Sequence, residues 1–482
     1  MTIRDLNPKI VWENFYGLTQ IPRPSKHEDM AKEYLYNWGV KHGLETLRDK
    51  SGNIIIRKPA TKGFENKVGV IMQAHMDMVP QKTAETKHDF LKDPIKTQIL
   101  GEWVGATGTT LGADNGMGVA MALAALEDET LQHGPLEALF TYDEETGMTG
   151  AFGLQEKFLK GDLLLNLDSE TAGEIYIGCA GSMDASADFK YRSFKAPEGF
   201  ESYVLSLKGF QGGHSGMDII LYRANANKVA ARIVAKLQAE GAKVVSFNGG
   251  SLRNAIPFEA EVGLLVPDAK KATAIVKAEF AAVKAEFKET DPSAACTFEK
   301  AAKPFKKYIQ DKVALAAVKA LMACPNGVDR MSAAVEGLVE TSNNMAVVRT
   351  EKGHWTVKNL LRSSVDSAKE DLGKRMKAVF ELAGATTDFK AGYSGWAPKP
   401  EMPILKVMKK VWKDLYGNEP AIMAIHAGLE CAIMGAKYPN WDMVSFGPTI
   451  VHPHSPDERV NIESVGKVWE FLKALLPVVP EK

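Results

Sequence analysis

The sequence predicts an α/β domain formed by both ends of the chain and interrupted by an inserted α+β domain. Short apolar runs near the start are each followed directly by polar residues, as in the buried strands of a mostly parallel sheet. The pattern changes near Asp184 and returns after about residue 396. At 482 residues the chain is also long enough for two to three domains of about 150 residues.

The first domain segment, residues 1–183, alternates helical and extended patterns. Helices are expected at residues 10–18, 29–41 and 116–127, and strands at 53–57, 68–73, 136–141 and 163–167. Polar side chains at the ends of such strands should gather at one edge of the sheet, where open α/β sheets bind ligands.

The inserted domain, residues 184–396, shows one order of elements nearly twice, without detectable sequence identity between the halves. The first half has strands at 203–208, 244–247, 259–265 and 296–298 and helices at 225–239 and 270–287. The second half has helices at 312–322 and 369–382 and strands at 335–341, 346–350, 355–362 and 387–391. We therefore expect two similar α+β lobes.

The last segment, residues 397–482, resumes the first pattern and should complete the α/β domain. A helix is expected at 404–416, a strand at 442–446 and a final helix at 465–476. The polar loop GPTIVHPHSPDE lies between that strand and the final helix.

Composition excludes several classes of protein. Hydrophobic residues make up 45% and charged residues 25%, and the formal charge of -1 leaves no basic footprint for nucleic acid. The start lacks the apolar core of a signal peptide, and no helical apolar run approaches the ~20 residues of a membrane span. Close cysteine pairs are absent, which favours a reducing cytoplasm and leaves His, Asp and Glu to hold any metal; the cysteines are Cys179, Cys296, Cys324 and Cys431.

Two motifs near the start carry side chains suited to a metal. In AHMDMV, His75 and Asp77 are two residues apart and face the same way on an extended backbone, as a ligand and the carboxylate that orients it would. In GADNG, Asp114 lies at a strand-to-helix turn between glycines. A helix N-cap is the alternative reading of Asp114.

Three later motifs add further candidates. DEETG places Glu144 and Glu145 side by side, where the carboxylates repel one another unless a cation or solvent relieves them. A solvated acidic turn explains DEETG equally well. LLLNLDSE places Asp168 directly after an apolar strand. HPHSPDE places His454 in a loop stiffened by prolines, with His452 as the competing ligand.

Together these motifs point to more than one metal ion. Two imidazoles and three carboxylates exceed the needs of one tetrahedral zinc. They suit two ions that share a bridging carboxylate about 3.5–4 Å apart.

The five motifs, in this order, resemble the signature of the co-catalytic dizinc aminoacylase/carboxypeptidase/dipeptidase family. The segments IPRPSKHE, FQGGHSGMDI, LRNAIP, LLRSS and IHAGLECA are further similar to its aminoacyl-histidine (Xaa-His) dipeptidase subgroup. The resemblance covers essentially the whole chain. It implies a zinc-peptidase α/β catalytic domain, with a mostly parallel central sheet flanked by helices, and a lid formed by the insertion.

The resemblance also implies roles for the metal motifs. Asp114 would bridge two Zn²⁺ ions per subunit, with Co²⁺ or Mn²⁺ as other candidates, and a cis peptide would join Asp114 to Asn115. His75 and Asp168 would complete one site, and Glu145 and His454 the other. Asp77 would orient His75, and Glu144 would be the general base for a water held between the metals.

Other roles implied by the resemblance fall mainly on the insertion. His214 would stabilise the oxyanion, and Arg362 would grip the substrate carboxylate. Further substrate contacts are expected from Asn254, His426 and Gly428. His214 could reach the metals only if the domains close or if it comes from a partner chain, so a homodimer is compatible with the resemblance.

The function implied is hydrolysis of small peptides, namely dipeptides of the Xaa-His type including β-Ala-His. The alternative within the family is an N-acyl amino acid amidohydrolase or carboxypeptidase, because the metal ligands alone do not separate these activities. A protein with a purely structural metal site is a third hypothesis. Such a site needs no spare carboxylate, so Glu144 beside Glu145 favours catalysis.

Overall fold

The computed structural model describes residues 2–482, which form two compact units. The first unit contains the chain up to Gly178 together with Pro398–Ala424 and Leu429–Lys482. The second unit contains Cys179–Ala397 and the short segment Ile425–Gly428. Both ends of the chain therefore build the first unit.

The central sheet of the first unit is parallel in its middle and antiparallel towards its edges. The neighbouring strands β6, β3, β7 and β23 run parallel, whereas β1, β2 and β6 pair antiparallel and β8 pairs antiparallel with β23. The strand order is β1 (Glu45–Arg48), β2 (Ile54–Lys58), β6 (Leu136–Thr141), β3 (Val70–His75), β7 (Leu163–Asn166), β23 (Asp442–Ser445), β8 (Glu174–Cys179) and β22 (Ala421–Ile425).

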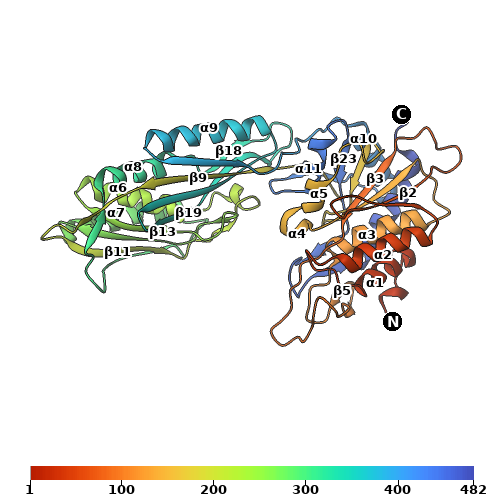
Figure 1. Cartoon of the computed structure of the whole chain (residues 1–482), viewed down its shortest axis with the longest axis horizontal. Helices are drawn as coiled ribbons and strands as arrows, with labels where there is room; N and C mark the ends of the chain where they lie inside the picture. Colours follow the sequence, from red (N-terminus) through yellow and green to blue (C-terminus); the bar gives the residue numbers. More distant parts are fainter. Residues whose placement is uncertain (1) are drawn as a thin grey trace. The chain divides into compact units, whose positions relative to one another are not determined.

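The strands β3, β6 and β7 are buried along their whole length because both of their faces are covered. Val70 and Met72 of β3 belong to the main core of this unit, and Ile71 between them is equally buried on the other face. In Figure 1, α2 and α3 lie near β2 and β3; α2 packs on β2, and α3 packs on β3 and on α1. The helices that build the main core are α1 (Lys9–Thr19), α2 (Asp29–Lys41), α3 (Ala113–Glu127), α10 (Pro403–Tyr416) and α12 (Ile462–Leu475).

A smaller sheet in the first unit brings the loop after residue 446 next to the turn that precedes α3. In it β25 pairs with both β24 and β5, and β5 pairs with β4. The strands are β4 (Thr97–Leu100), β5 (Trp103–Ala106), β24 (Ile450–Val451) and β25 (Arg459–Asn461).

The second unit is a twisted sheet with helices α6 to α9 packed on one of its faces (Figure 1). The helices are α6 (Ala226–Ala239), α7 (Ala269–Glu286), α8 (Asp311–Ala323) and α9 (Asp366–Leu382). The strand order is β16 (Ala295–Lys300), β11 (Glu201–Lys208), β15 (Ala260–Val266), β13 (Lys243–Gly249), β19 (Val339–Glu351), β20 (His354–Ser363), β9 (Gly181–Lys190) and β21 (Thr386–Ala391), with β18 (Gly327–Met331) beside β19.

The two halves expected in the insertion share this one sheet, because β13 of the first half pairs with β19 of the second at Gly249 and Val348. Short additional pairs join β10 (Ser193–Lys195) to β17 (Lys307–Ile309) and β12 (Gly213–His214) to β14 (Ala255–Ile256). The β12–β14 pair carries His214.

The structure differs from the sequence prediction at several strands of this unit, among them β19 and β9. Residues 335–341 and 346–350 were expected as separate strands, but β19 continues through Ser342–Met345. Its polar residues are buried and bonded: Asn343 donates to the Pro325 carbonyl over 2.7 Å and Asn344 to the Ala255 carbonyl over 2.8 Å. The strand β9 was not predicted at all, although Met183, Ala185, Ala187 and Phe189 alternate with polar residues as in a strand with one buried face.

The unit boundary also falls elsewhere than at residue 184. Gly181 at the start of β9 is already paired with Ser363 of β20, so the second unit begins at Cys179. The segment Ile425–Gly428 joins this unit because the Ala180 N–H donates to the carbonyls of Ile425 and Ala427. None of the helices described between residues 2 and 482 has both the length and the apolar character that a membrane crossing requires.

Candidate active site

His75 is the last residue of β3, and Asp77 fixes the direction of its ring. The Nδ1 atom of His75 lies 3.1 Å from Oδ1 of Asp77, which turns Nε2 towards the carboxylates of other segments. Asp77 also accepts the backbone N–H groups of Glu144 and Glu145 over 3.0 and 3.2 Å. Burial opposes charge on Asp77, but the His75 contact and these hydrogen bonds lower its pKa.

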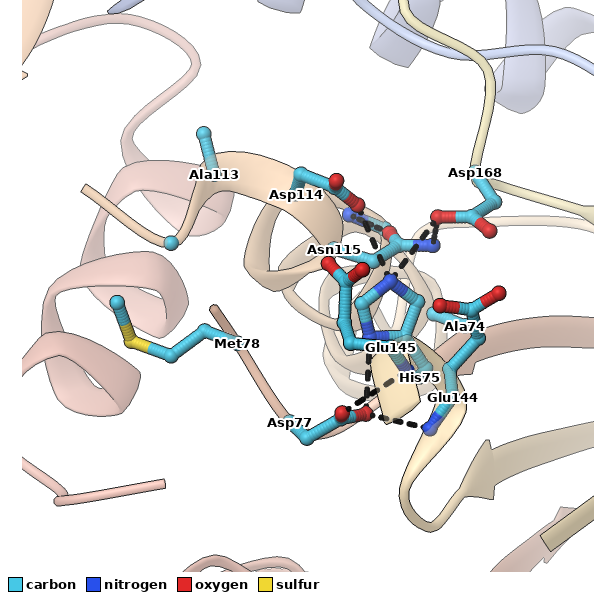
Figure 2. Close-up of polar contacts among 12 residues, drawn as sticks. Ala74, His75, Asp77, Met78, Ala113, Asp114, Asn115, Glu144, Glu145 and Asp168 are labelled. Carbon is cyan, nitrogen blue, oxygen red and sulfur yellow. Dashed lines mark hydrogen bonds and ion pairs between the residues drawn. The ribbon is translucent and has the colours of Figure 1, made fainter. Parts of the chain in front are cut away.

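The carboxylate of Asp114 lies between two imidazoles. Its Oδ1 is 3.1 Å from Nε2 of His75, and its Oδ2 is 3.1 Å from Nε2 of His454. Asp168 approaches the same nitrogen of His75 at 3.4 Å, and Glu145 approaches the same nitrogen of His454 at 3.0 Å. Figure 2 shows Asp114, Glu145 and Asp168 directed towards the His75 ring. Thus the five side chains predicted as ligands lie together in the first unit.

The carboxylates of this cluster lie close together, so positive charge between them would stabilise their ionised forms. Contacts with Asp114 and Glu145 raise the pKa of His454 to about 11. The pKa of His75 is also raised well above its usual range, because Asp168, Asp114 and Asp77 outweigh the effect of burial. Protons on the imidazoles supply the positive charge that a cation would supply.

The donor set fits divalent metal ions. Atoms of His75, Asp114 and Glu145 lie within 4.8 Å of one another, and imidazole and carboxylate are the ligands of co-catalytic zinc sites. Oε1 of Glu145 is buried and, among the described residues, receives no hydrogen bond despite the nearby His454. A metal ligand is expected to keep such an oxygen free of donors.

Glu144 lies beside the cluster at the turn after β6, in α4 (Glu144–Gly147). Burial raises its pKa well above the usual range; His75 opposes the shift, and the carboxylates of Asp168, Glu430 and Glu145 add to it. Nearby cations would lower that pKa and favour the ionised form, which accepts a proton. Its position, separate from the imidazole contacts, suits a base rather than a ligand.

Asn115 is a residue of this site that the sequence analysis did not assign. The peptide bond between Asp114 and Asn115 is cis, as the resemblance implied. The Asn115 side chain donates from Nδ2 to Asp168 and accepts the Gly118 N–H at Oδ1 over 3.1 Å. The position of Asn115 directly after Asp114 in the GADNG motif is the sequence feature that could have identified it as a residue of the site.

Glu430, from the IHAGLECA segment, is a further carboxyl near Glu144. Its Oε2 accepts hydrogen bonds from Gln73 over 2.7 Å and from Thr141 over 2.6 Å, and its carboxyl is fully buried. Burial raises its pKa to about 8, so it carries a proton at neutral pH.

The predicted competitor His452 is exposed, and its carbonyl only accepts the Ser455 hydroxyl, whereas the His454 ring contacts Asp114.

In the second unit, His214 and Arg362 form a polar pair. Nδ1 of His214 accepts the backbone N–H groups of Gly216 and Met217 over 3.3 and 3.1 Å, so the ring proton resides on Nε2. That Nε2 lies 3.5 Å from Nη2 of Arg362. Burial and the Arg362 charge lower the pKa of His214, which keeps the ring neutral.

Arg362 is 6% exposed and, within residues 2–482, forms no ion pair with a carboxylate. Its Nε lies 3.4 Å from the Ser215 hydroxyl, and Tyr393 is a further partner. Buried arginines are rarely left without an anion. An anionic ligand would complete this pair.

The remaining predicted substrate residues also belong to the second unit. His426 is buried, and its Nε2 lies 2.7 Å from the Ser342 hydroxyl. Gly428 leaves space for Tyr393, whose hydroxyl would lie 2.2 Å from an added Cβ. The Asn254 carbonyl accepts the Ser215 N–H over 2.8 Å, and the Asn254 side chain is exposed.

Comparisons with known proteins agree with this chemistry. Residues 71–477 match the model of peptidase family M20/M25/M40. The cytosol non-specific dipeptidase of Escherichia coli K12 is 45% identical over 489 aligned residues, which cover 100% of this chain and 99% of that protein.

Solved structures give the same result. The crystal structure of aminoacylhistidine dipeptidase from Vibrio alginolyticus matches with a TM-score of 0.95 and 46% identity, over 100% of this chain and 99% of that one. An aminopeptidase from Bacillus cereus, at 17% identity and a TM-score of 0.58 over 98% of this chain and 99% of that one, shares the fold alone. The predicted zinc-peptidase α/β fold and the family resemblance are confirmed.

Proposed function

The chain belongs to peptidase family M20/M25/M40, and on that basis we propose that it hydrolyses dipeptides at a two-metal centre in its first unit. The observation that carries the proposal is the Asp114 carboxylate, which has one imidazole at each oxygen. One carboxylate between two sets of ligands suits two ions that it bridges.

The metal-holding residues proposed are those predicted from the motifs. His75 and Asp168 would hold one ion and Glu145 and His454 the other, with Asp114 shared and with Zn²⁺ as the metal. When bound, zinc lowers the pKa of water towards ~7 and polarises a carbonyl oxygen. Asp77 holds the His75 ring and the start of α4 in place through the hydrogen bonds described above.

Glu144 is proposed as the general base. Its carboxylate takes a proton from the attacking water and passes it to the leaving amine, work that contributes about 10²–10⁴ in rate. The burial of Glu144 supports this assignment, because a carboxylate with a raised pKa binds a proton readily near neutral pH.

The second unit is proposed to contact the substrate. His214, with its proton on Nε2, is suited to donate to the oxyanion, and Arg362 is suited to bind a free carboxylate. Asn254, His426 and Gly428 are proposed as further substrate contacts. Binding of a free C-terminal carboxylate by Arg362 would restrict the substrates to short peptides.

The substrate class rests on the relatives. The Escherichia coli protein is named a non-specific dipeptidase and the Vibrio protein an aminoacylhistidine dipeptidase. We propose dipeptides in general as substrates, with Xaa-His peptides including β-Ala-His among them. The name of the Escherichia coli relative also supports a cytoplasmic location. Assembly as a homodimer stays a prediction from the resemblance.

The test is an activity panel on the purified protein. β-Ala-His, several Xaa-His dipeptides and several dipeptides without histidine are compared with N-acetyl amino acids, with and without a metal chelator. We expect dipeptide hydrolysis that the chelator abolishes and Zn²⁺ restores. Faster turnover of N-acetyl amino acids would assign the chain to the amidohydrolases instead, and activity that resists the chelator would overturn the two-metal mechanism.

A further inference from the structure

The buried carboxylate of Glu458 accepts four consecutive backbone N–H groups from the turn that contains Asp114. Oε2 accepts the N–H groups of Leu111 and Gly112 over 2.8 and 3.0 Å. Oε1 accepts those of Ala113 and Asp114 over 2.7 and 3.2 Å. Glu458 is only 2% exposed. Two donors at each oxygen leave no room for a proton, so the geometry matches the ionised carboxylate.

The smaller sheet of the first unit brings Glu458 to this turn. Arg459, the next residue, pairs with Gly105 of β5, and the chain runs from β5 into the turn. Glu458 also lies four residues after His454 in the same HPHSPDE loop. A single loop therefore provides the predicted metal ligand His454 and also the Glu458 carboxylate, which holds the turn that contains the predicted ligand Asp114.

Arg23 holds the same turn through a carbonyl. Its Nη2 donates to the Gly112 carbonyl, and its Nη1 donates to the carbonyls of Met76 and Asp77 over 3.2 and 2.9 Å. Arg23 is 2% exposed and comes from the IPRPSKHE segment, no residue of which has a role in the mechanism proposed above. It thereby ties the turn before Asp114 to the chain that follows His75.

Two glycines make room for the Arg23 guanidinium. Gly112 has a left-handed φ of 71°, and an added Cβ there would lie 2.5 Å from Nη2 of Arg23. An added Cβ at Gly116 would lie 2.7 Å from the same nitrogen. The glycines on both sides of Asp114 in GADNG are thus explained by the approach of Arg23.

We propose that Glu458 and Arg23 are positioning residues that fix the Leu111–Asp114 turn, and so set the Asp114 carboxylate between His75 and His454. The inference rests on the two-metal centre proposed above. Charged side chains are almost never fully buried without partners. All four hydrogen bonds that Glu458 accepts come from this turn, and Arg23 adds one to the Gly112 carbonyl while its other two join the turn to Met76 and Asp77. Holding a bridging ligand to within about 0.5 Å requires that kind of support.

The first test replaces the carboxylate with an amide of the same shape. In Glu458→Gln, the new NH₂ group would face two backbone N–H donors, so the turn must move. Zn²⁺ is titrated calorimetrically into the metal-free wild type, Glu458→Gln and the control Glu463→Gln, an exposed glutamate in α12. All three are measured at a temperature at which circular dichroism shows them folded.

We expect two bound Zn²⁺ per wild-type chain and at least tenfold weaker binding at one or both sites in Glu458→Gln, with the control unchanged. A merely structural contribution would lower the melting temperature of the metal-free variant and leave Zn²⁺ affinity intact, and that result overturns the proposal. A wild type that binds no Zn²⁺ would instead overturn the metal centre on which the proposal rests.

The second test asks whether the two residues act on the same turn. Arg23→Lys keeps the charge but loses the forked donors. If both residues set Asp114, the loss of Zn²⁺ affinity in the double variant is smaller than the product of the two single losses. Losses that multiply would contradict a shared turn.

Hydrogen exchange on the metal-free wild type covers the case in which Glu458→Gln does not fold. The amides of residues 111–114 are then expected to exchange at least tenfold more slowly than exposed turn amides such as that of residue 62. Exchange as fast as in those exposed turns would overturn the proposal.

Discussion

The backbone N–H of Glu144 donates to Oδ1 of Asp77 over 3.0 Å, and the same oxygen faces Nδ1 of His75. Asp77 therefore positions both the proposed base, Glu144, and the predicted metal ligand, His75. Any change at Asp77 should act on metal binding and on proton transfer together.

Asp77→Asn is expected to weaken Zn²⁺ binding by about 10–100-fold, as changes behind a ligating histidine typically do. The amide keeps the shape but can present an N–H to His75, which favours the wrong tautomer. Zn²⁺ affinity is measured by competition with a chromogenic chelator. Asp414→Asn, at an exposed aspartate of α10, is the control. Equal affinity in Asp77→Asn and wild type would show that Asp77 does not orient the ligand.

Glu144→Gln is expected to keep the fold and both metals while lowering kcat by about 10²–10⁴. The amide is nearly isosteric but cannot accept a proton from water. Steady-state kinetics on a dipeptide, together with metal analysis, check the prediction. Glu156→Gln, at an exposed residue of the same chain segment, should behave as wild type. A near-normal kcat in Glu144→Gln would remove Glu144 as the base.

His214→Ala should lower kcat by about 10²–10³, the usual loss of one oxyanion donor, without changing zinc content. The reason is that Nε2 of His214 carries the proton, because Nδ1 already accepts two backbone N–H groups. Kinetics and metal analysis on the same preparation provide both readouts. Loss of zinc, or an unchanged kcat, would contradict the assignment.

Arg362 is expected to distinguish a free carboxylate from an amide. Wild type should hydrolyse a dipeptide with a kcat/KM at least tenfold higher than its C-terminal amide, because a charge-assisted pair contributes about 1.5–3 kcal/mol. Arg362→Lys should lose most of that preference, chiefly through KM. If the variant discriminates as strongly as wild type, another group binds the carboxylate.

His426 should make the protein less stable in acid. Burial first, and then the Arg362 charge, lower its pKa to about 3, below the ordinary value of 6.5. The unfolded chain therefore binds this proton more readily. The stability contribution is fully present above pH 6.5 and is lost as the pH falls from 6.5 towards 3.

Between pH 7.5 and pH 5 this linkage amounts to about 2 kcal/mol. Urea denaturation of metal-free wild type and His426→Asn at the two pH values measures it. The variant should lose less stability on acidification by roughly that amount. His27→Asn, at an exposed histidine, should lose as much as wild type. Parallel losses in His426→Asn and wild type would contradict the linkage.

The elements that could be predicted are those whose burial requires a recognisable pattern of apolar residues in the sequence. The strand β6 is buried on both faces, and its observed bounds, Leu136–Thr141, are those expected. The side chains that follow such strands, His75 and Glu145 among them, lie close together because parallel strands end at one edge.

The remaining features could not be predicted because they depend on polar residues whose hydrogen-bond partners lie far away in the sequence. Asn343 and Asn344 are polar, yet they continue β19 since their amides bond to segments far along the chain. Glu458 looked like one more charged loop residue, and only the structure reveals the four N–H groups that it accepts. Polar residues of this kind follow no periodicity that a sequence could display.

The place of β23 in the sheet bears on how the chain is made. β23 comes from the last segment of the chain, yet it pairs with β7 on one side and β8 on the other. At about 5–20 residues per second, a ribosome needs on the order of ten seconds or more to supply it after β8 has emerged. During that interval the apolar edge of Leu163–Asn166 has no neighbour on that side, and open strand edges invite pairing with other chains. Stalled or truncated products, rather than the finished enzyme, should therefore be the species that aggregate.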